Sequence, residues 1–449
     1  MGKLFGTDGI RGVVNKDYGA VLAYRVGVAA ATVLAEEKKR PLFTIGKDTR
    51  LSSDLLEAAL IAGICSAGAD VIRLGVIPTP AVAFLTVDEK ADAGIVISAS
   101  HNPFEHNGIK IFNGSGFKLS DDLEEKIEEM VLSRERLPVC SGSEIGRVLV
   151  PEEDLTDRYI RHLISTIDPA ELKGLRLAVD CANGAASATA ARLFGALPVQ
   201  ADIFCDKPDG VNINTGCGST HLENLKAIMA KGEYDLGLAF DGDADRCLAV
   251  DETGAEMDGD HIMAACALLL RQEGRLPGDT IVATVMSNMG FHTFAKEQGL
   301  QLLCAKVGDR NVLEQMRKGG YALGGEQSGH LIFLDHATTG DGQLAALQLL
   351  RTICRTGKKA SGLNAMVAQF PQELLNVPVA SNEAKLRIMD DPALKAAAES
   401  VQAELEGCGR LLVRPSGTEA LIRVMVEAPE KETAEKYAKR IAEVVSGIQ

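Results

Sequence analysis

A unit of apolar strand, polar turn and helix occurs three times in this chain, and it limits the possible folds more than any other feature. The three copies begin at Leu42, Arg176 and Thr280. Strands that alternate with helices of this length are typical of βαβ units, in which most strands of a sheet run parallel. The repeat therefore predicts three related α/β domains with mixed, mostly parallel sheets.

The last part of the chain departs from this pattern. A less regular stretch from Gln369 to Pro378 precedes a helix over 385–406, strands over 410–413 and 420–427, and a final helix from Lys431. This order predicts a smaller C-terminal α+β domain, joined to the rest by a hinge-like linker. A chain of 449 residues is too long for one hydrophobic core. We expect domain boundaries at 1–152, 153–253, 254–368 and 369–449.

Charge and cysteine usage exclude several classes of partner. The formal net charge of −15 argues against nucleic acid or an anionic membrane surface as the main partner, although it permits a small anionic substrate. The ten cysteines contain no Cys-x-x-Cys pair, which indicates reduced thiols in a cytoplasmic protein rather than disulfides or a zinc site. The N-terminus lacks the apolar core of a signal peptide, and no apolar run is long enough to span a bilayer.

The first candidate site is a serine that follows a buried strand. The β-branched residues Ile95–Ile97 predict this strand, and Pro103 prevents its continuation. Ser100 is then left just beyond the carboxyl end of the strand, where ligands bind in open α/β sheets. Its hydroxyl is a candidate nucleophile or carrier of a transferred group, and the alternative is a serine that only satisfies a turn.

The second candidate site is an acidic loop after the apolar run 236–240. Asp241, Asp243 and Asp245 place three carboxylates within five residues, and their mutual repulsion needs a cation to offset it. Oxygen ligands of this kind suit Mg²⁺. The alternative is a solvated acidic turn.

Two other classes of protein carry similar acidic loops. In a calcium EF-hand the sixth position needs a glycine, but here it is Arg246, and the flanks are predicted strands rather than helices. In an aspartyl-phosphate enzyme Asp241 would be the nucleophile, but a small Thr or Val is typical at the fifth position, where this chain has Asp245.

The third candidate site is a polar loop between two apolar stretches. Glu326, Gln327, Ser328 and His330 offer hydrogen-bond donors and acceptors that suit the hydroxyl groups of a sugar. Taken alone, the same residues are equally compatible with an ordinary turn.

The fourth candidate site lies in the C-terminal domain. A turn with two hydroxyls and a glycine can bind phosphate through backbone N–H groups, with guanidinium groups at its edge. The chain has no G-x-x-x-x-G-K-[ST] loop, so a Walker A site for ATP is excluded. The residues of this phosphate-loop candidate are Arg414, Ser416, Gly417, Thr418 and Arg423.

Three single residues complete the candidates near the serine. Lys110 lies ten residues after Ser100 and is a candidate proton acceptor or phosphate contact. Arg11, in the Gly-rich N-terminal loop, could neutralise a phosphoryl group, and His101 could orient the serine or cap its turn.

Taken together, the four motifs resemble the α-D-phosphohexomutase family. The motifs occur in the order and spacing of that family, one in each expected domain. They are Ser98–Pro103, Asp241–Arg246, Gly325–His330 and Arg414–Glu419. Within it, the opening Phe5–Gly12, together with Ala99 and Gln327, is similar to the bacterial branch that acts on glucosamine phosphates.

The resemblance implies four domains around one central cleft, a mobile fourth domain and a serine that is phosphorylated in the active enzyme. It implies one Mg²⁺ per subunit, held by Asp241, Asp243, Asp245 and a phosphate oxygen on Ser100. It also implies catalytic roles for Ser100, Lys110, His330, Arg11 and His101, and substrate binding by Arg246, Glu326, Gln327, Ser328, Arg414, Ser416, Gly417, Thr418 and Arg423.

The reaction implied is the conversion of glucosamine 6-phosphate to glucosamine 1-phosphate through a 1,6-bisphosphate, for the synthesis of UDP-N-acetylglucosamine and cell-wall precursors. Glucosamine or glucose 1,6-bisphosphate is the expected activator. A homodimer through the first domain is also expected, with neither nucleic acid nor a membrane as partner. The alternatives are a mutase of glucose or mannose phosphates in the same family and an aspartyl-phosphate phosphotransferase that uses Asp241.

Overall fold

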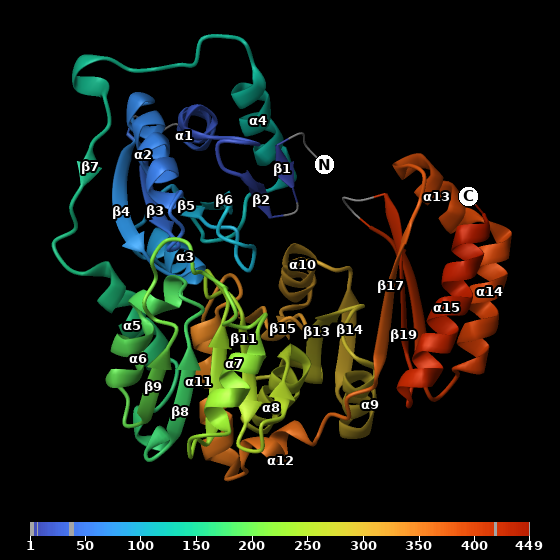
Figure 1. The fold of residues 1–449 in the computed structure, drawn as a ribbon. Coiled ribbons are helices and arrows are strands. Elements are labelled where there is room, and N and C mark those ends of the chain that lie inside the picture. The colour runs from blue at the N-terminus through green and yellow to red at the C-terminus, as the bar shows by residue number, and fades with distance from the viewer. Residues whose placement is uncertain (1–3, 7, 36–39, 417–419, 449) are drawn as a thin grey trace. The chain divides into compact units, whose positions relative to one another are not determined.

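A computed structural model describes residues 4–6, 8–35, 40–416 and 420–448. The chain divides into two compact units, which are coloured by residue number in Figure 1. The first unit comprises Met1–Met286 and Leu300–Met366 and contains three sheets. The second unit comprises Ser287–Gly299 and Val367–Gln449 and contains one sheet.

The first sheet is mixed, with the described strands in the order β1-β2-β6-β5-β3-β4-β7. β5, β3, β4 and β7 run parallel to one another, whereas β1, β2, β6 and β5 pair antiparallel in succession toward one edge. Parallel strands end at the same edge of the sheet, which brings the turns after β3 and β5 together. The strands are Phe5–Gly6, Gly9–Val13, Leu42–Lys47, Asp70–Val76, Ala93–Ile97, His106–Asn113 and Val148–Leu149, for β1 to β7 in order.

Helices α1 and α2 pack on this sheet with their backbones in close contact. A Cβ atom on Gly27 would lie 2.4 Å from the Leu60 carbonyl oxygen, and one on Gly63 would lie 2.2 Å from that of Tyr24. Only glycine allows this approach, so the pair fixes how the two helices cross. The helices of this part of the chain are α1 Ala20–Leu34, α2 Ser53–Ser66, α3 Thr79–Asp88, α4 Asp121–Leu132 and the short 3₁₀ helix Gly142–Glu144.

The second sheet has the strand order β12-β11-β10-β8-β9 and places the acidic loop at the end of β10. β10 pairs parallel with β8 and antiparallel with β11. The strands are β8 Arg176–Asp180, β9 Gln200–Phe204, β10 Leu236–Phe240, β11 Cys247–Asp251 and β12 Glu256–Met257. The helices are α5 Leu155–Ser165, α6 Ala190–Gly195, α7 Leu222–Met229 and the 3₁₀ turns Pro169–Leu172 and Ala185–Ala188.

The third sheet has the order β14-β13-β15-β16. Its helix α11 is buried continuously from Gly342 to Ile353 and contacts both the second and the third sheets. A helix that is covered on all sides belongs to the core between two layers. The elements are α8 Gly259–Gln272, β13 Thr280–Thr284, β14 Gln301–Ala305, α10 Asp309–Gly319, β15 Leu323–Gly325, β16 Leu331–Phe333, α11 Gly342–Thr356, α12 Ala360–Asn364 and the 3₁₀ turn Pro277–Asp279.

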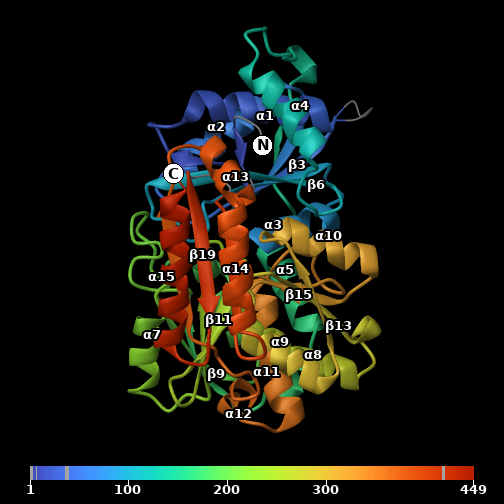
Figure 2. The ribbon, with the colours of Figure 1, turned by 90° about the vertical axis from the view of Figure 1, so that its right-hand side faces the viewer.

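The second unit is built on an antiparallel sheet of order β17-β19-β18. Helices α14 and α15 lie side by side against this sheet (Figure 2). α9, whose sequence lies between β13 and β14, also belongs to this unit, since the Asn288 side chain bonds to the backbone of Phe370. The elements are α9 Met289–Gln298, β17 Gln372–Pro378, α13 Asn382–Asp390, α14 Pro392–Glu404, β18 Arg410–Pro415, β19 Leu421–Glu427 and α15 Lys431–Gly447.

Two sequence predictions for this unit are wrong. The single helix expected over 385–406 is broken, because Asp391 adopts an extended conformation (ψ 130°) before Pro392, as the proline ring requires. The expected linker at 369–378 contains the strand β17, which pairs with β19 along its whole length.

The fold class itself is confirmed. Three sheets with mixed strand directions carry helices, and a smaller α+β part follows at the C-terminal end of the chain. Among the described residues, no helix contains an 18-residue window that is apolar enough for a transmembrane span.

Candidate active site

Ser100 follows β5 in a left-handed backbone conformation, with φ of +51°. The position is buried, and the residue has only 1% of its surface exposed. Left-handed backbone is costly for a residue other than glycine and persists where neighbours hold it. Arg50 Nη2 donates to the Ser100 carbonyl oxygen at 3.0 Å, and Asn214 Nδ2 donates to the same oxygen at 2.9 Å. These two bonds hold the serine in its strained conformation.

Arg50 is itself fixed by a buried ion pair. Its Nη1 atom donates to Asp48 Oδ2 at 2.8 Å, and Ser98 Oγ donates to the same carboxylate oxygen at 2.6 Å. Ser98 Oγ in turn accepts the Ser100 N–H at 2.9 Å. Sequence analysis treated residues 47–50 only as a turn. The available signal was its position after a parallel strand, which places its polar side chains at the same edge as Ser100.

The Ser100 hydroxyl points at the acidic loop. Ser100 Oγ donates to Asp241 Oδ2 at 2.6 Å. Ligand oxygens of Asp241, Asp243 and Asp245 all lie within 4.8 Å of one another, and the three residues are buried. Burial, together with the charges of Asp245 and Asp243, raises the pKa of Asp241 well above its usual value. The serine and the three carboxylates, which the sequence placed in different domains, therefore form one cluster.

The donor set fits a hard divalent cation. Asp243 Oδ1 and Asp245 Oδ1 are buried and have no hydrogen-bond partner among the described residues. Buried carboxylate oxygens without partners are costly unless a cation coordinates them. The calcium EF-hand is excluded, because the loop joins strands β10 and β11 rather than two helices.

Lys110, on β6, is surrounded by these carboxylates. Its Nζ lies 2.9 Å from Asp243 Oδ2, 3.1 Å from Asp8 Oδ2 and 3.6 Å from Asp245 Oδ2. Burial alone would lower the pKa of Lys110, but the charges of Asp243, Asp8 and Asp245 raise it overall. The ammonium form is therefore favoured, which suits a phosphate contact better than a proton acceptor.

A cavity of about 450 Å³ opens beside Ser100 within the first unit. It is lined by residues of all three sheets and their loops, and its charged residues have both signs. Of the predicted site residues, it brings together Arg11, Ser100, Asp245, Arg246, Glu326 and His330. It is also lined by Arg310, which the sequence offers as a further cleft residue, and by Asp8, Lys118 and Asp309, which were not predicted for the site.

Two histidines lie close to the reacting groups. His101 Nδ1 is 3.3 Å from Ser100 Oγ, and burial together with Arg246 and Arg11 lowers the pKa of His101 to about 4, so its ring is neutral at pH 7. The His330 ring packs on Gly340, where an added Cβ would lie 2.5 Å from the imidazole. Both ring nitrogens of His330 are buried without a hydrogen-bond partner in the described part of the chain, and Nε2 lies 3.7 Å from Asp309 Oδ2. Of the two histidines, only His330 lines the cavity.

Only some of the sugar-loop candidates line the cavity. Glu326 lines the cavity, and its Oε1 accepts the Gly308 N–H at 3.0 Å. Gln327 does not line it, because its Nε2 donates to Asp258 Oδ2 at 2.9 Å. Ser328 is exposed and also lies outside this cavity. The sequence grouped these residues by proximity alone and could not show which way each side chain points.

The phosphate-loop candidates lie in the second unit. Arg414 and Arg423 are directly opposite each other on β18 and β19, and burial and Arg423 lower the pKa of Arg414. Ser416 is buried, and its carbonyl oxygen accepts a bond of 2.5 Å from Lys385 Nζ, a contact that sequence analysis missed. The remaining two candidates, Gly417 and Thr418, lie outside the described residues.

Comparison with known proteins covers the whole chain. Models of the phosphoglucomutase/phosphomannomutase family match four successive parts of it. They correspond to α/β/α domain I at 2–137, domain II at 157–254, domain III at 258–370 and the C-terminal domain at 374–444.

Relatives and solved structures agree with these matches. The phosphoglucosamine mutase of Caldanaerobacter subterraneus is 52% identical over 447 residues, 99% of each chain, and that of Ruminiclostridium cellulolyticum is 51% identical over 449 residues, covering 100% of this chain and 99% of the relative. A phosphoglucomutase/phosphomannomutase family protein from Burkholderia thailandensis superposes with a TM-score of 0.80 at 26% identity, covering 98% of this chain and 97% of that one.

The Aspergillus fumigatus N-acetylphosphoglucosamine mutase, solved with GlcNAc-6P and magnesium, has the same fold. Its TM-score is 0.73 at 18% identity, and the superposition covers 99% of this chain and 96% of that one. The chain therefore belongs to the phosphoglucomutase/phosphomannomutase family of α-D-phosphohexomutases.

Proposed function

We propose that this protein is a phosphoglucosamine mutase, an isomerase that interconverts glucosamine 6-phosphate and glucosamine 1-phosphate. The observation that carries the proposal is the placement of Ser100 Oγ 2.6 Å from Asp241, in a cavity with Arg11 and Arg246 on its wall. The choice of substrate is supported by relatives that are phosphoglucosamine mutases and about half identical along the full chain.

In the active form Ser100 carries a phosphoryl group. The Ser100 Oγ–P bond breaks as a bond forms between phosphorus and O1 of glucosamine 6-phosphate; the proton of the O1 hydroxyl passes to a base, and Ser100 Oγ takes up a proton and becomes a free hydroxyl. The resulting 1,6-bisphosphate turns end for end and returns its 6-phosphoryl group to Ser100, as the Ser100 hydroxyl proton passes to a base and O6 takes up a proton. Glucosamine 1-phosphate is then released.

Asp241, Asp243 and Asp245 would hold Mg²⁺ together with an oxygen on Ser100. Once bound, the ion would neutralise charge on the phosphoryl group during transfer. Support comes from the convergent oxygens of the three carboxylates and from the magnesium in the solved Aspergillus enzyme.

The surrounding side chains would orient the sugar phosphate and move its protons. Among the proton-transfer candidates, the unpartnered nitrogens of His330 and the neutral ring of His101 suit a base better than Lys110, which carboxylates surround. Arg11 and Arg246 would neutralise charge near Ser100.

The substrate itself would be held at two ends. Glu326 and Ser328 would bind sugar hydroxyls. Gln327 would contribute through the position of its loop, since its amide is bonded to Asp258. The phosphate that does not react would be bound by Arg414, Ser416, Gly417, Thr418 and Arg423.

The same proposal includes four domains, the last of them mobile, and a homodimer through the first domain. The domains would span residues 1–152, 153–253, 254–368 and 369–449. The activator would be glucosamine or glucose 1,6-bisphosphate, because loss of this intermediate leaves Ser100 without its phosphoryl group. Pre-incubation of dephosphorylated protein with either bisphosphate should restore activity.

A kinetic comparison of glucosamine, glucose and mannose 6-phosphates tests the substrate. We expect kcat/KM for the glucosamine compound to be higher by at least about tenfold. Equal or faster turnover of the glucose or mannose compound would replace the glucosamine assignment with the glucose or mannose branch of the family.

A nucleophilic Asp241 is the second candidate, because this residue directly follows a buried strand and contacts Ser100 Oγ. Hydroxylamine cleaves an acyl phosphate but not a serine phosphate ester. Label from a ³²P-bisphosphate that survives hydroxylamine supports Ser100, and label released by it supports Asp241.

A further inference from the structure

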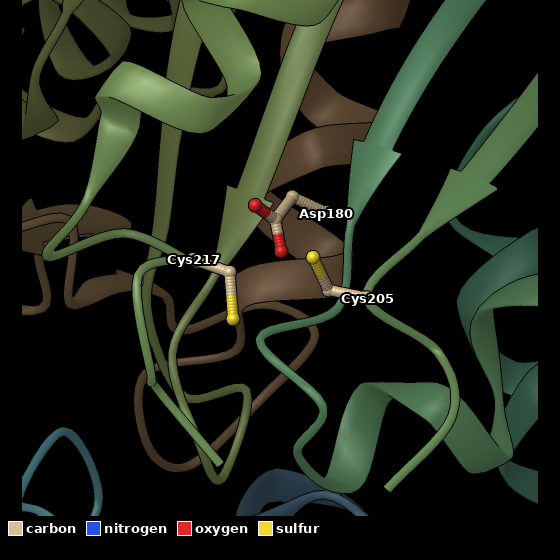
Figure 3. A group of neighbouring side chains, drawn as sticks. All are labelled: Asp180, Cys205 and Cys217. Carbon is tan, nitrogen blue, oxygen red and sulfur yellow. The ribbon is translucent and has the colours of Figure 1, made fainter. Parts of the chain in front are cut away.

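A second group of metal-ligating side chains lies in the first unit, away from the acidic loop. Asp180 ends β8, Cys205 follows β9 and Cys217 lies in the loop before α7; Figure 3 shows the three side chains gathered in one place, with the Cys205 sulfur beside the Asp180 carboxylate. One carboxylate oxygen and the two sulfurs all lie within 4.8 Å of one another. The sequence could not predict this cluster, because its cysteines are far apart in the chain and form no Cys-x-x-Cys pair.

Each ligand atom is oriented by a further hydrogen bond. Asp180 Oδ1 accepts the Ala182 N–H at 2.9 Å, and Oδ2 accepts the Gly218 N–H at 3.0 Å. These bonds fix the carboxylate in the cluster. Supporting bonds of this kind orient the ligands of metal sites.

The two sulfurs accept amide N–H groups. Asn224 Nδ2 lies 3.5 Å from Cys205 Sγ, and Asn183 Nδ2 lies 3.7 Å from Cys217 Sγ. These bonds hold the two sulfurs in place beside the carboxylate, as bonds from neighbouring groups do at metal sites.

We propose that Asp180, Cys205 and Cys217 form a binding site for one thiophilic divalent cation of the Zn²⁺ class. In a tetrahedral zinc site, bonds of about 2.0–2.3 Å place ligand atoms roughly 3.3–3.8 Å apart, which is compatible with the upper limit of 4.8 Å on the distances in this cluster. Binding releases the two thiol protons to solvent. A water molecule would supply the fourth ligand. Thiolates select this ion over Mg²⁺, which the all-oxygen loop at Asp241–Asp245 suits instead.

The site closes the loop that holds the active serine. Residues 205–217 contain Asn214, whose Nδ2 donates to the Ser100 carbonyl oxygen. Cys205 and Asn214 both have left-handed backbone, with φ of +50° and +59°. A cation that joins the two ends of this strained loop would stabilise the position of Asn214 and, through it, that of Ser100.

Cobalt binding tests the proposal on the untagged, reduced, full-length protein in excess Mg²⁺, which occupies the oxygen site. We expect about one equivalent of Co²⁺ to bind with near-ultraviolet sulfur-to-cobalt charge-transfer absorption, and Zn²⁺ to displace it. Cys205→Ser and Cys217→Ser should each abolish that band. Cys354→Ser, which alters a cysteine of similar burial to Cys205 outside the cluster, should retain it. Absence of the band from the unmodified protein, or its persistence in both cluster variants, would overturn the proposal.

Alkylation kinetics give a test that does not depend on the folding of variants. With the sites mapped by mass spectrometry, Zn²⁺ should slow the modification of Cys205 and Cys217 by about tenfold or more while leaving exposed Cys304 unchanged. Equal rates with and without Zn²⁺ would overturn the site. So would a disulfide between the two cysteines in protein purified without reductant, because the pair would then be a redox element.

Discussion

The positively charged side chains around Ser100 and those on β18 and β19 have different surroundings. Around Ser100, cations are matched by nearby carboxylates, as with Arg50 and Asp48 at 2.8 Å or Lys110 and Asp243 at 2.9 Å. On β18 and β19 of the second unit, Arg414 and Arg423 occupy directly opposite positions in the strand register. Like charges directly opposite on two strands are destabilising.

Under the proposed function, the first region keeps a fixed geometry and the second binds the phosphate that does not react. Matched ion pairs around Ser100 hold the serine and the carboxylates in place before any ligand arrives. Repulsion between the facing arginines would lower the stability of the second unit, and a bound phosphate would offset this loss. Substitutions in the two regions should therefore change different kinetic constants.

The largest effect is expected at the centre of the first region. Ser100→Ala removes the phosphate carrier and should lower kcat for glucosamine 6-phosphate on the order of 10⁴-fold or more. The exposed Ser115→Ala is the matched control and should retain full activity. Normal turnover by Ser100→Ala, in a coupled assay that detects glucosamine 1-phosphate, would contradict both the mechanism and the contrast between the regions.

A smaller but still large effect is expected for the metal ligands. Asp243→Asn should lower kcat by about 10³-fold and weaken Mg²⁺ binding measured by calorimetry, because one buried carboxylate leaves the site. Chelation with EDTA should remove activity from the unmodified protein, and added Mg²⁺ should restore it. Asp122→Asn, on the exposed face of α4, should behave like the unmodified enzyme; a similar loss there would point to a nonspecific charge effect.

The second region should respond in KM. Arg414→Ala and Arg423→Ala should each raise KM by roughly 10–100-fold, with a smaller change in kcat, since a charge-assisted phosphate contact contributes about 1.5–3 kcal/mol. Without ligand, each variant should unfold at the same temperature as the parent or slightly above it, because the repulsion between the arginines is relieved. A clear loss of thermal stability in both variants would show that the arginines are structural.

The smallest kinetic effect should come from the residue that holds the serine backbone. Arg50→Lys keeps the charge but loses the planar fork that joins Asp48, Ser100 and Asn102, so kcat should fall by about tenfold. The free energy of unfolding should fall by about 1–3 kcal/mol in urea titrations, because buried acceptors lose a donor. An unchanged kcat with reduced stability would limit Arg50 to a structural role.

The elements that sequence could predict are those set by local pattern. Buried strands such as Ile95–Ile97 have a strong apolar signature, and the acidic run at 241–245 directly follows one of them. Ser100 and the three aspartates could therefore be predicted as candidates, although the contact between Ser100 and Asp241 bridges 141 positions of the chain.

What could not be predicted depends on contacts between distant segments or on side-chain direction. Arg50 and Asn214 meet at one carbonyl oxygen, yet each lies in an unremarkable turn in the sequence. Gln327 was expected to face the substrate, and only the structure places its amide on Asp258. The break before Pro392 was foreseeable from the restriction that proline imposes on the preceding residue.

Helix α11 has a consequence for how this protein is made. It fills the space between the second and third sheets, and the Gly342 N–H that begins it donates to Ala244 in the acidic loop at 3.0 Å. Tyr159, in α5, donates its hydroxyl to Asp341 at the same helix start. During translation the second sheet is therefore complete well before the helix that covers it leaves the ribosome. A chain truncated before residue 342 would expose apolar surface and be prone to aggregate, so the second domain should not be obtainable as an isolated fragment.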